Sequence, residues 1–174
     1  MKLIKEITAW PFVVIMACSG VICYLVPPEW IKAIPGVSLL TLWIIELVPS
    51  FPAYIEKSHF PEVAELYFPL MLLISPLHFV WIWRQEDQHT LWRNLISINR
   101  FRSAIQLLFT TAFLLFVAMA SFMWGGTQLE VIPWNESKIA LFLAGHIAAG
   151  GGFFSLLAIT LSGYKELFKN KNHI

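Results

Sequence analysis

The residues of this sequence best suited to chemistry are two histidines, His78 and His146, because each lies inside a long apolar run. Counted inward from the outer ends of their runs, His78 lies about 17 Å deep and His146 about 11 Å deep, at a rise of about 1.5 Å per residue. Two histidines at similar depth on facing helices are candidate axial ligands for a b-type haem. The simpler alternative is that each histidine hydrogen-bonds a neighbouring helix.

Other groups that carry chemistry are scarce in this sequence. It contains no glycine-rich phosphate loop, no nucleophile elbow, no H-E-x-x-H and no paired carboxylates at a catalytic spacing. Cys18 and Cys23 are five residues apart, which separates them by about 140° around a helix and argues against a disulfide or a thiolate metal site. We therefore expect no catalytic residue, no metal and, unless the histidines hold haem, no cofactor.

The run that carries His146 also carries a stripe of small residues. They follow one another at four-residue spacing, so that a regular helix places them on one face: Ala140, Ala144, Ala148 and Gly152. Lipid tails are as apolar as leucine, and helices in a bilayer therefore associate where small side chains allow close approach. The stripe predicts a packing seam against the protein's own helices or, as the alternative, against a second copy or another membrane protein.

Composition indicates the environment in which these groups must be positioned. Of the 174 residues, 57% are hydrophobic and only 13% are charged, whereas soluble domains have about 25% charged residues. Several uncharged runs have the length of about 17 to 25 residues that crosses a bilayer. The formal net charge of +1, without a basic stripe, argues against nucleic-acid binding. We expect one all-α integral membrane domain over residues 1–174, with the lipid bilayer as its first partner.

Four apolar runs are predicted to cross the bilayer as transmembrane helices. They occupy residues 10–26, 67–83, 104–124 and 139–163, and Pro76 should kink the second of them. The outer connector, residues 27–66, contains an apolar segment at 37–48 that is too short to cross and suits a helix lying in the interface. A positive start followed by an apolar run also fits a secretory signal, but the run continues past Cys18, which favours an uncleaved span.

The distribution of positive charge predicts how these spans are oriented. Nine lysines and arginines lie on one predicted side of the membrane and three on the other, so the positive-inside rule places both termini in the cytoplasm. All four arginines lie in one connector, residues 84–103, and are the expected determinants of topology: Arg84, Arg93, Arg100 and Arg102. The expected location is the inner (plasma) membrane, crossed several times.

Two families of small bacterial membrane proteins resemble this layout. The disulfide-generating quinone oxidoreductases share the four spans, but they carry cysteine pairs in the outer connectors, and residues 27–66 and 125–138 contain none. The layout is also similar to the immunity proteins that protect bacteria from pore-forming colicins. The resemblance covers the chain as architecture, and the first outer connector of that family is matched by Leu47, Val48, Pro49 and Ser50 and by the later Pro61 and Pro69. It implies a non-enzymatic four-helix bundle of the inner membrane.

Three functional hypotheses follow from the sequence. The first is a non-enzymatic protein that acts by helix contact in the bilayer, as an immunity, exclusion or accessory factor. The second is a redox subunit that holds haem b between His78 and His146. The third is a homo-oligomeric pore or a transport subunit, against which stands the lack of a continuous polar face on any predicted span.

Overall fold

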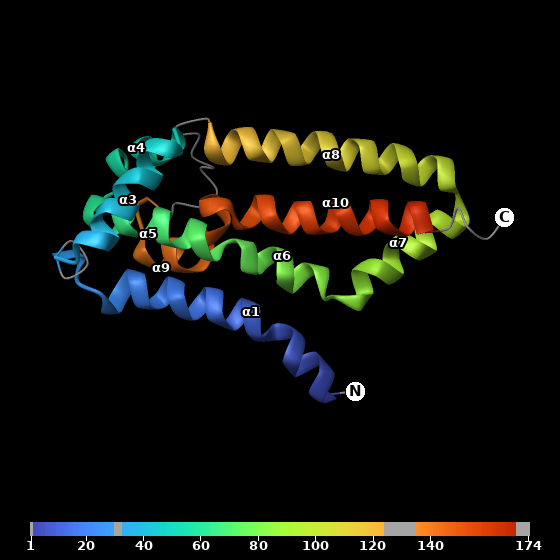
Figure 1. The fold of residues 1–174 in the computed structure, drawn as a ribbon, viewed down its shortest axis with the longest axis horizontal. Helices are drawn as coiled ribbons and strands as arrows, with labels where there is room; N and C mark the ends of the chain where they lie inside the picture. Colours follow the sequence, from blue (N-terminus) through green and yellow to red (C-terminus); the bar gives the residue numbers. More distant parts are fainter. Residues whose placement is uncertain (1, 30–32, 124–134, 170–174) are drawn as a thin grey trace.

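The computed structural model describes residues 2–29, 33–123 and 135–169, and within these ranges every regular element is helical. The predicted all-α fold class is therefore confirmed for the part of the chain that is described. The longest helices run roughly along the long axis of the molecule, and shorter helices gather at the two ends (Figure 1).

The first third of the chain forms one long helix and one sharply bent pair. Helix α1 (Lys2–Gly20) continues directly into η1 (Val21–Leu25), a π-helical turn. Helix α3 (Pro35–Leu47) covers most of the predicted 37–48 segment, and α4 (Ser50–Glu56) follows it at an angle of 110°. Proline stands at the start of α3, where its missing N–H costs nothing. The connector helix predicted at 37–48 is thus present, and its place in the interface stays a prediction.

The second apolar run is divided near its middle. Helix α5 (Pro61–Ile74) ends at Ser75, and α6 (Pro76–Trp83) begins with Pro76. Proline has no N–H to donate to the Leu72 carbonyl, and that carbonyl instead accepts a hydrogen bond from the Ser75 backbone N–H at 3.2 Å. The predicted break at Pro76 is confirmed, and the helix begins earlier than residue 67.

The arginine connector forms a helix of its own. Helix α7 (Glu86–Ile98) is followed, after Asn99 alone, by α8 (Arg100–Phe122). The Asn99 side chain caps α8 by accepting a hydrogen bond from the Arg102 backbone N–H at 2.9 Å. The third predicted span therefore begins four residues earlier than expected, at Arg100.

The last apolar run is one long helical segment with two π-helical stretches. Helix α9 (Lys138–Ala140) leads into η2 (Leu141–Gly145) and η3 (Ile147–Gly151), and α10 (Gly152–Lys169) completes the run. Ala149 and Gly150 leave helical geometry, and Gly150 has a φ of 108°, which a residue with a side chain rarely adopts. The helix is therefore bent close to His146.

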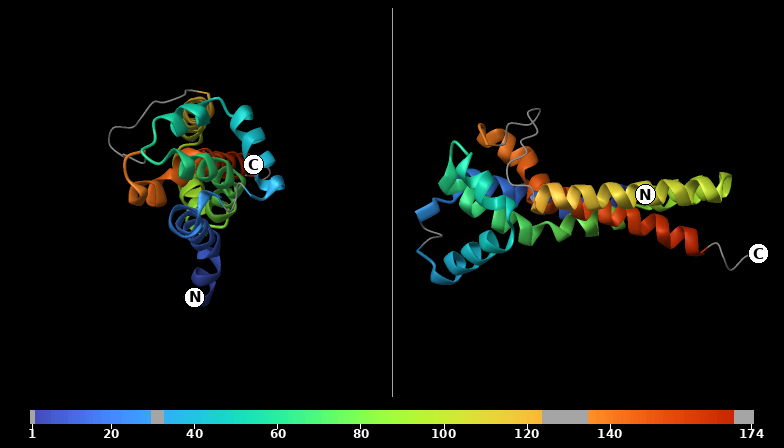
Figure 2. Two further views of the ribbon diagram at one scale, coloured as in Figure 1. Left: turned by 90° about the vertical axis from the view of Figure 1, so that its left-hand side faces the viewer. Right: turned by 90° about the horizontal axis from the view of Figure 1, so that it is seen from above.

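Helices α6 and α10 lie at the centre of the assembly. Helix α8 runs along one side of α10, while α1 lies on the other side of α6 (Figure 1). Helices α3, α4, α5 and α9 crowd one end, and α7 lies at the opposite end (Figure 1); the right-hand view of Figure 2 shows the same crowded end. The larger hydrophobic core joins α1, α3, α4, α5 and the π-helical stretches, and a smaller one joins α7, α8 and α10.

The hydrogen bonds at the two ends agree with the predicted grouping of the connectors. At one end the His59 backbone N–H donates to the Asn135 carbonyl at 2.8 Å, which joins the two predicted outer connectors. At the other end the Arg100 guanidinium donates to the Leu167 carbonyl at 3.0 Å, which joins the arginine connector to the end of α10. Which of these ends faces the cytoplasm stays a prediction.

Three helical segments in the described ranges are long and apolar enough to cross a membrane: Pro61–Trp83, Arg100–Phe122 and Lys138–Lys169. They correspond to the second, third and fourth predicted spans. The bent pair of α3 and α4 also passes this test when it is taken as one broken span, and Trp10–Leu25 is a shorter apolar helix. Three to four membrane-compatible helices make a membrane location plausible, while the crossing of residues 10–26 stays a prediction.

Candidate functional site

The break between α5 and α6 lies against the bend in the last helical run. Ser75, at the break, is fully buried, and its hydroxyl lies 2.8 Å from the Met71 carbonyl of its own helix and 2.9 Å from the Ala149 carbonyl. A hydroxyl has one proton, so the two carbonyls share a single donor. Ser75 thus connects the break at Pro76 to the carbonyl of Ala149, which leaves helical geometry.

His78 and His146 meet directly beside this break. The Nε2 atom of His78 lies 3.0 Å from Nδ1 of His146, and the two rings are stacked with centroids 5.1 Å apart. Both side chains are almost completely buried, at 3% and 4% exposure. Depth counting along the sequence had placed them at similar levels, and the structure brings them into contact.

The surrounding hydrogen bonds define which ring nitrogens carry protons. Nδ1 of His78 lies 3.2 Å from the Ser75 carbonyl, which only accepts, so Nδ1 carries the proton. In a neutral His78 ring, Nε2 is then an acceptor, and the proton between the two rings belongs to Nδ1 of His146. Ser75, His78 and His146 thus form a short chain of hydrogen bonds.

Glycine makes room for the two imidazole rings. A Cβ atom on Gly151 would lie 2.6 Å from both Cε1 of His78 and the carbonyl oxygen of His146, closer than real Cβ contacts. A Cβ atom on Gly150 would lie 2.9 Å from a Leu72 methyl group, in addition to the strain of its positive φ. Gly150 and Gly151 are therefore glycines because the histidine pair and α5 approach the backbone here.

A second polar group satisfies the carbonyls of the first π-helical stretch. The Tyr67 hydroxyl lies 2.8 Å from the Leu141 carbonyl and 2.8 Å from the Ser19 hydroxyl, and Ser19 donates to the Phe142 carbonyl at 2.7 Å. Tyr67 and Ser19 are both fully buried. These side chains connect α1 and α5 to the irregular helix, which otherwise would expose unpaired carbonyls in an apolar core.

Sequence reasoning missed Ser19, Tyr67 and Ser75 because isolated hydroxyls are common in apolar helices. The available signal was their position. Ser75 directly precedes a proline, and Ser19 directly precedes Gly20, which are places where a helix often loses a regular hydrogen bond. A hydroxyl next to a helix breaker in an apolar run is therefore a candidate for cross-helix bonding.

The predicted seam of small residues is only partly enclosed. Ala148 is buried in the larger core, and Ala140, Ala144 and Gly152 are half-buried. The two π-helical stretches interrupt the regular four-residue register on which a single straight stripe depends. The best enclosed small residues are neighbours of the stripe: Gly145, Ala149, Gly150 and Gly151.

The four arginines fall into two pairs. Arg100 donates to the Leu167 carbonyl, and the Nε atom of Arg93 lies 3.8 Å from the buried carboxylate of Glu166. The guanidinium groups of Arg84 and Arg102 are exposed and make no hydrogen bond or ion pair to another described residue. Two arginines thus hold α7 and α8 to α10, and two face outward.

Comparison with known proteins adds no family to this picture, because no protein-family model, no curated protein and no solved structure matches the chain. The resemblance to colicin immunity proteins stays a prediction from the sequence.

The chemistry open to the histidine pair is limited by its neighbours. Among the described residues there is no group of three or more His, Cys, Asp or Glu side chains that could hold a metal ion. The 3.0 Å contact also occupies the two nitrogens that would face an iron, so haem would bind between these rings only after they separated. As it stands, the pair connects two interrupted helices by neutral hydrogen bonds.

Proposed function

We propose that this chain is a non-enzymatic, multi-pass protein of the inner (plasma) membrane that acts by helix contact within the bilayer, as an immunity, exclusion or accessory factor. Its partner is a transmembrane helix of another protein. The support comes from how unevenly the apolar helices are buried inside the molecule.

The observation that carries the proposal is the open surface of α8. Only 11% of the apolar window of α8 is buried inside the protein, against 39% for each of the other two full-length helices. Its outward side is rich in large side chains, and Phe109 is 72% exposed. Large aromatic side chains on an unburied helix are suited to packing against another helix as well as against lipid.

The buried polar groups favour the same function. The side chains of Ser19, Tyr67, Ser75 and His78 are each directed to a carbonyl or to one another. Groups that are satisfied in this way hold helices together and have no hydrogen-bonding capacity left for a substrate. We therefore place the functional surface on the outside of the bundle.

The test is photo-crosslinking in the native membrane from two exposed positions. A photoreactive amino acid at Phe109 of α8 should yield a crosslink to a different membrane protein, while one at Val13 of α1, which is also exposed, should yield mainly lipid adducts. A crosslinked product of twice the chain mass would show that α8 contacts a second copy of this chain and not a different protein. Lipid adducts alone at both positions would overturn the proposal.

A b-type haem subunit is the second candidate, and the buried contact of His78 with His146 is the observation that favours it. For this function the two rings would move apart, and His78 and His146 would each offer one unprotonated ring nitrogen to a haem, which would supply electron-transfer chemistry. A visible spectrum of the purified protein decides the matter. A Soret band that disappears in both His78→Ala and His146→Ala would establish haem binding, and its absence after expression with added haem would eliminate it.

A further inference from the structure

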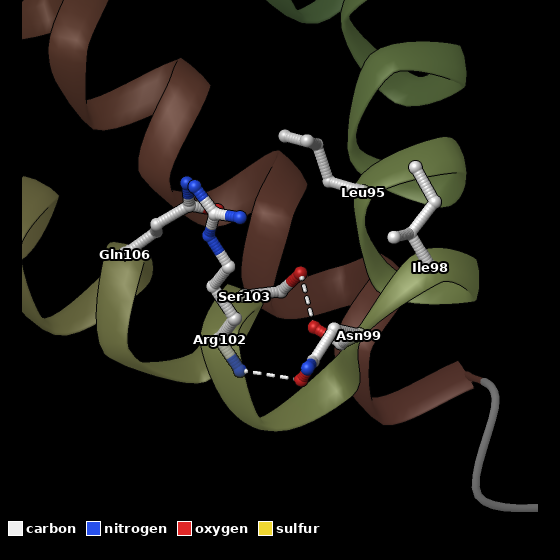
Figure 3. A pocket seen from close by; sticks show the side chains of 6 residues that line it. All are labelled: Leu95, Ile98, Asn99, Arg102, Ser103 and Gln106. Atoms are coloured by element: carbon white, nitrogen blue, oxygen red, sulfur yellow. Dashed lines mark hydrogen bonds between the residues drawn. The ribbon is translucent and has the colours of Figure 1, made fainter.

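A small cavity opens between α7 and the first turns of α8. It has a volume of about 150 Å³ and is lined by six residues: Leu95, Ile98, Asn99, Arg102, Ser103 and Gln106. Leu95 and Ile98 come from α7, and the guanidinium of Arg102 is directed along α8 toward Gln106 (Figure 3). The cavity therefore has an apolar wall on one helix and hydrogen-bond donors on the other.

The guanidinium of Arg102 is the donor at this cavity that can bind an anion. Asn99 and Ser103 are partly used inside the chain, since Asn99 Oδ1 accepts from the Arg102 backbone and the Ser103 hydroxyl donates to the Asn99 carbonyl. The guanidinium of Arg102 makes no hydrogen bond or ion pair within the described residues. A planar guanidinium with an amide beside it is well suited to two oxygens of a phosphodiester.

The surroundings of the cavity are apolar, which selects the kind of anion. Ile98 is 81% exposed and Phe101 is 76% exposed, directly beside Arg102. A soluble phosphate gains nothing from such neighbours, whereas a lipid headgroup arrives with acyl chains that cover them. Arg102 also lies in the first turn of a helix that is long and apolar enough to span a membrane. The end of such a helix lies at the depth of the lipid phosphates.

We propose that the cavity between α7 and α8 binds the phosphodiester headgroup of an anionic glycerophospholipid, with Arg102 and Gln106 on the phosphate and with Ile98 and Phe101 against the acyl chains. Basic pockets beside transmembrane helices recognise anionic lipids in this way. The site does not depend on the function proposed above.

The experiment is native mass spectrometry of the purified full chain in detergent, titrated with phosphatidylglycerol or with phosphatidylcholine. Phosphatidylglycerol should remain bound at lower concentration than phosphatidylcholine. Arg102→Gln should weaken phosphatidylglycerol binding about fivefold, as expected for one arginine near the lipid surface. Arg84→Gln is the matched control, since Arg84 is exposed at the other end of α7, and it should bind as the native chain does.

A second variant addresses the cavity without removing an arginine. Ile98→Glu places a negative charge at the mouth of the cavity, on a side chain exposed enough for the fold to tolerate it, and should also reduce phosphatidylglycerol binding. Equal binding of the two lipids, or equal losses in the Arg84 and Arg102 variants, would overturn the proposal in favour of general attraction to charge. Competition by inorganic phosphate at millimolar concentration would overturn it in favour of a free anion.

Discussion

Among the described residues, two histidine sites differ in how their ring nitrogens are paired. At the first, His78 and His146 bind each other and the Ser75 carbonyl without a charged partner. At the second, Nε2 of His89 donates to the Trp83 carbonyl at 3.1 Å, and Nδ1 lies 3.5 Å from the carboxylate of Glu166. The first site therefore relies on neutral hydrogen bonds, and the second on charge.

The difference follows from where each site lies along the helices. The first is in the middle of two apolar helices, where an unpaired charge is costly and a neutral pair is not. The second is at the end that carries α7, where Arg93 reaches solvent at 54% exposure and can be hydrated. Among the described residues, the histidine pair inside the apolar helices is thus joined by neutral hydrogen bonds, and Glu166 near the α7 end is paired with a charged arginine.

The largest expected effect comes from closing the space beside the first site. Gly151→Ala places a methyl group against the His146 carbonyl and the His78 ring and should reduce the free energy of unfolding by about 1–3 kcal/mol through overpacking. Gly163→Ala, near the second site, meets side-chain atoms of Leu107 and Trp92 and no backbone atom, and should cost less. Thermal unfolding in detergent measures both, with Gly36→Ala as the control because nothing lies within 4 Å of its Cβ position. A larger loss for Gly163→Ala would reverse the comparison.

The next effect tests whether the two histidines of the first site act as a unit. His78→Phe leaves the His146 N–H without its acceptor in an apolar core and should cost about 1–3 kcal/mol. The double variant with His146→Phe removes both partners and should cost clearly less than the sum of the single changes. Additive losses, measured by the same unfolding assay, would mean that the contact contributes nothing to stability.

Substitution along the small-residue stripe should have an intermediate effect that depends on position. Ala148 is buried in the larger core, whereas Ala144 is half-buried. Ala148→Leu should therefore lower stability by about 1–3 kcal/mol, and Ala144→Leu by less. If Ala144→Leu leaves stability unchanged while crosslinking from α8 to a partner is lost, the half-buried part of the stripe belongs to the docking surface.

The smallest effect is expected at the ionic site, and it should be asymmetric. Glu166 is the buried partner and Arg93 the exposed one, with side-chain exposures of 6% and 54%. Arg93→Gln leaves a buried carboxylate without its guanidinium and should cost about 1 kcal/mol, because the arginine is half exposed and solvent screens the 3.8 Å pair. Glu166→Gln leaves only a hydrated arginine and should cost less than about 1 kcal/mol. Equal losses in the unfolding assay would show that burial does not decide the cost.

The sequence could predict the helical class and the break at Pro76, because apolar run length and the missing proline N–H have direct structural consequences. It could also place His78 and His146 at similar depth by counting residues. It could not predict their direct contact, since that depends on π-helical turns at 141–145 and 147–151, and a small-residue stripe looks the same in a regular helix. The cross-helix roles of Ser19 and Ser75 likewise depend on which carbonyls lose their partners in three dimensions.

We propose that the chain crosses the membrane several times, with the α7 end in the cytoplasm and the end around Asn135 outside. The most direct measurement is labelling of single cysteines in intact cells with a membrane-impermeant maleimide, in a background where Cys18 and Cys23 are replaced by alanine. Glu136 and Asn94 are both exposed and lie at opposite ends. We predict that Glu136→Cys is labelled from outside and that Asn94→Cys is labelled only after the membrane is opened. Labelling of both positions from the same side would contradict this topology.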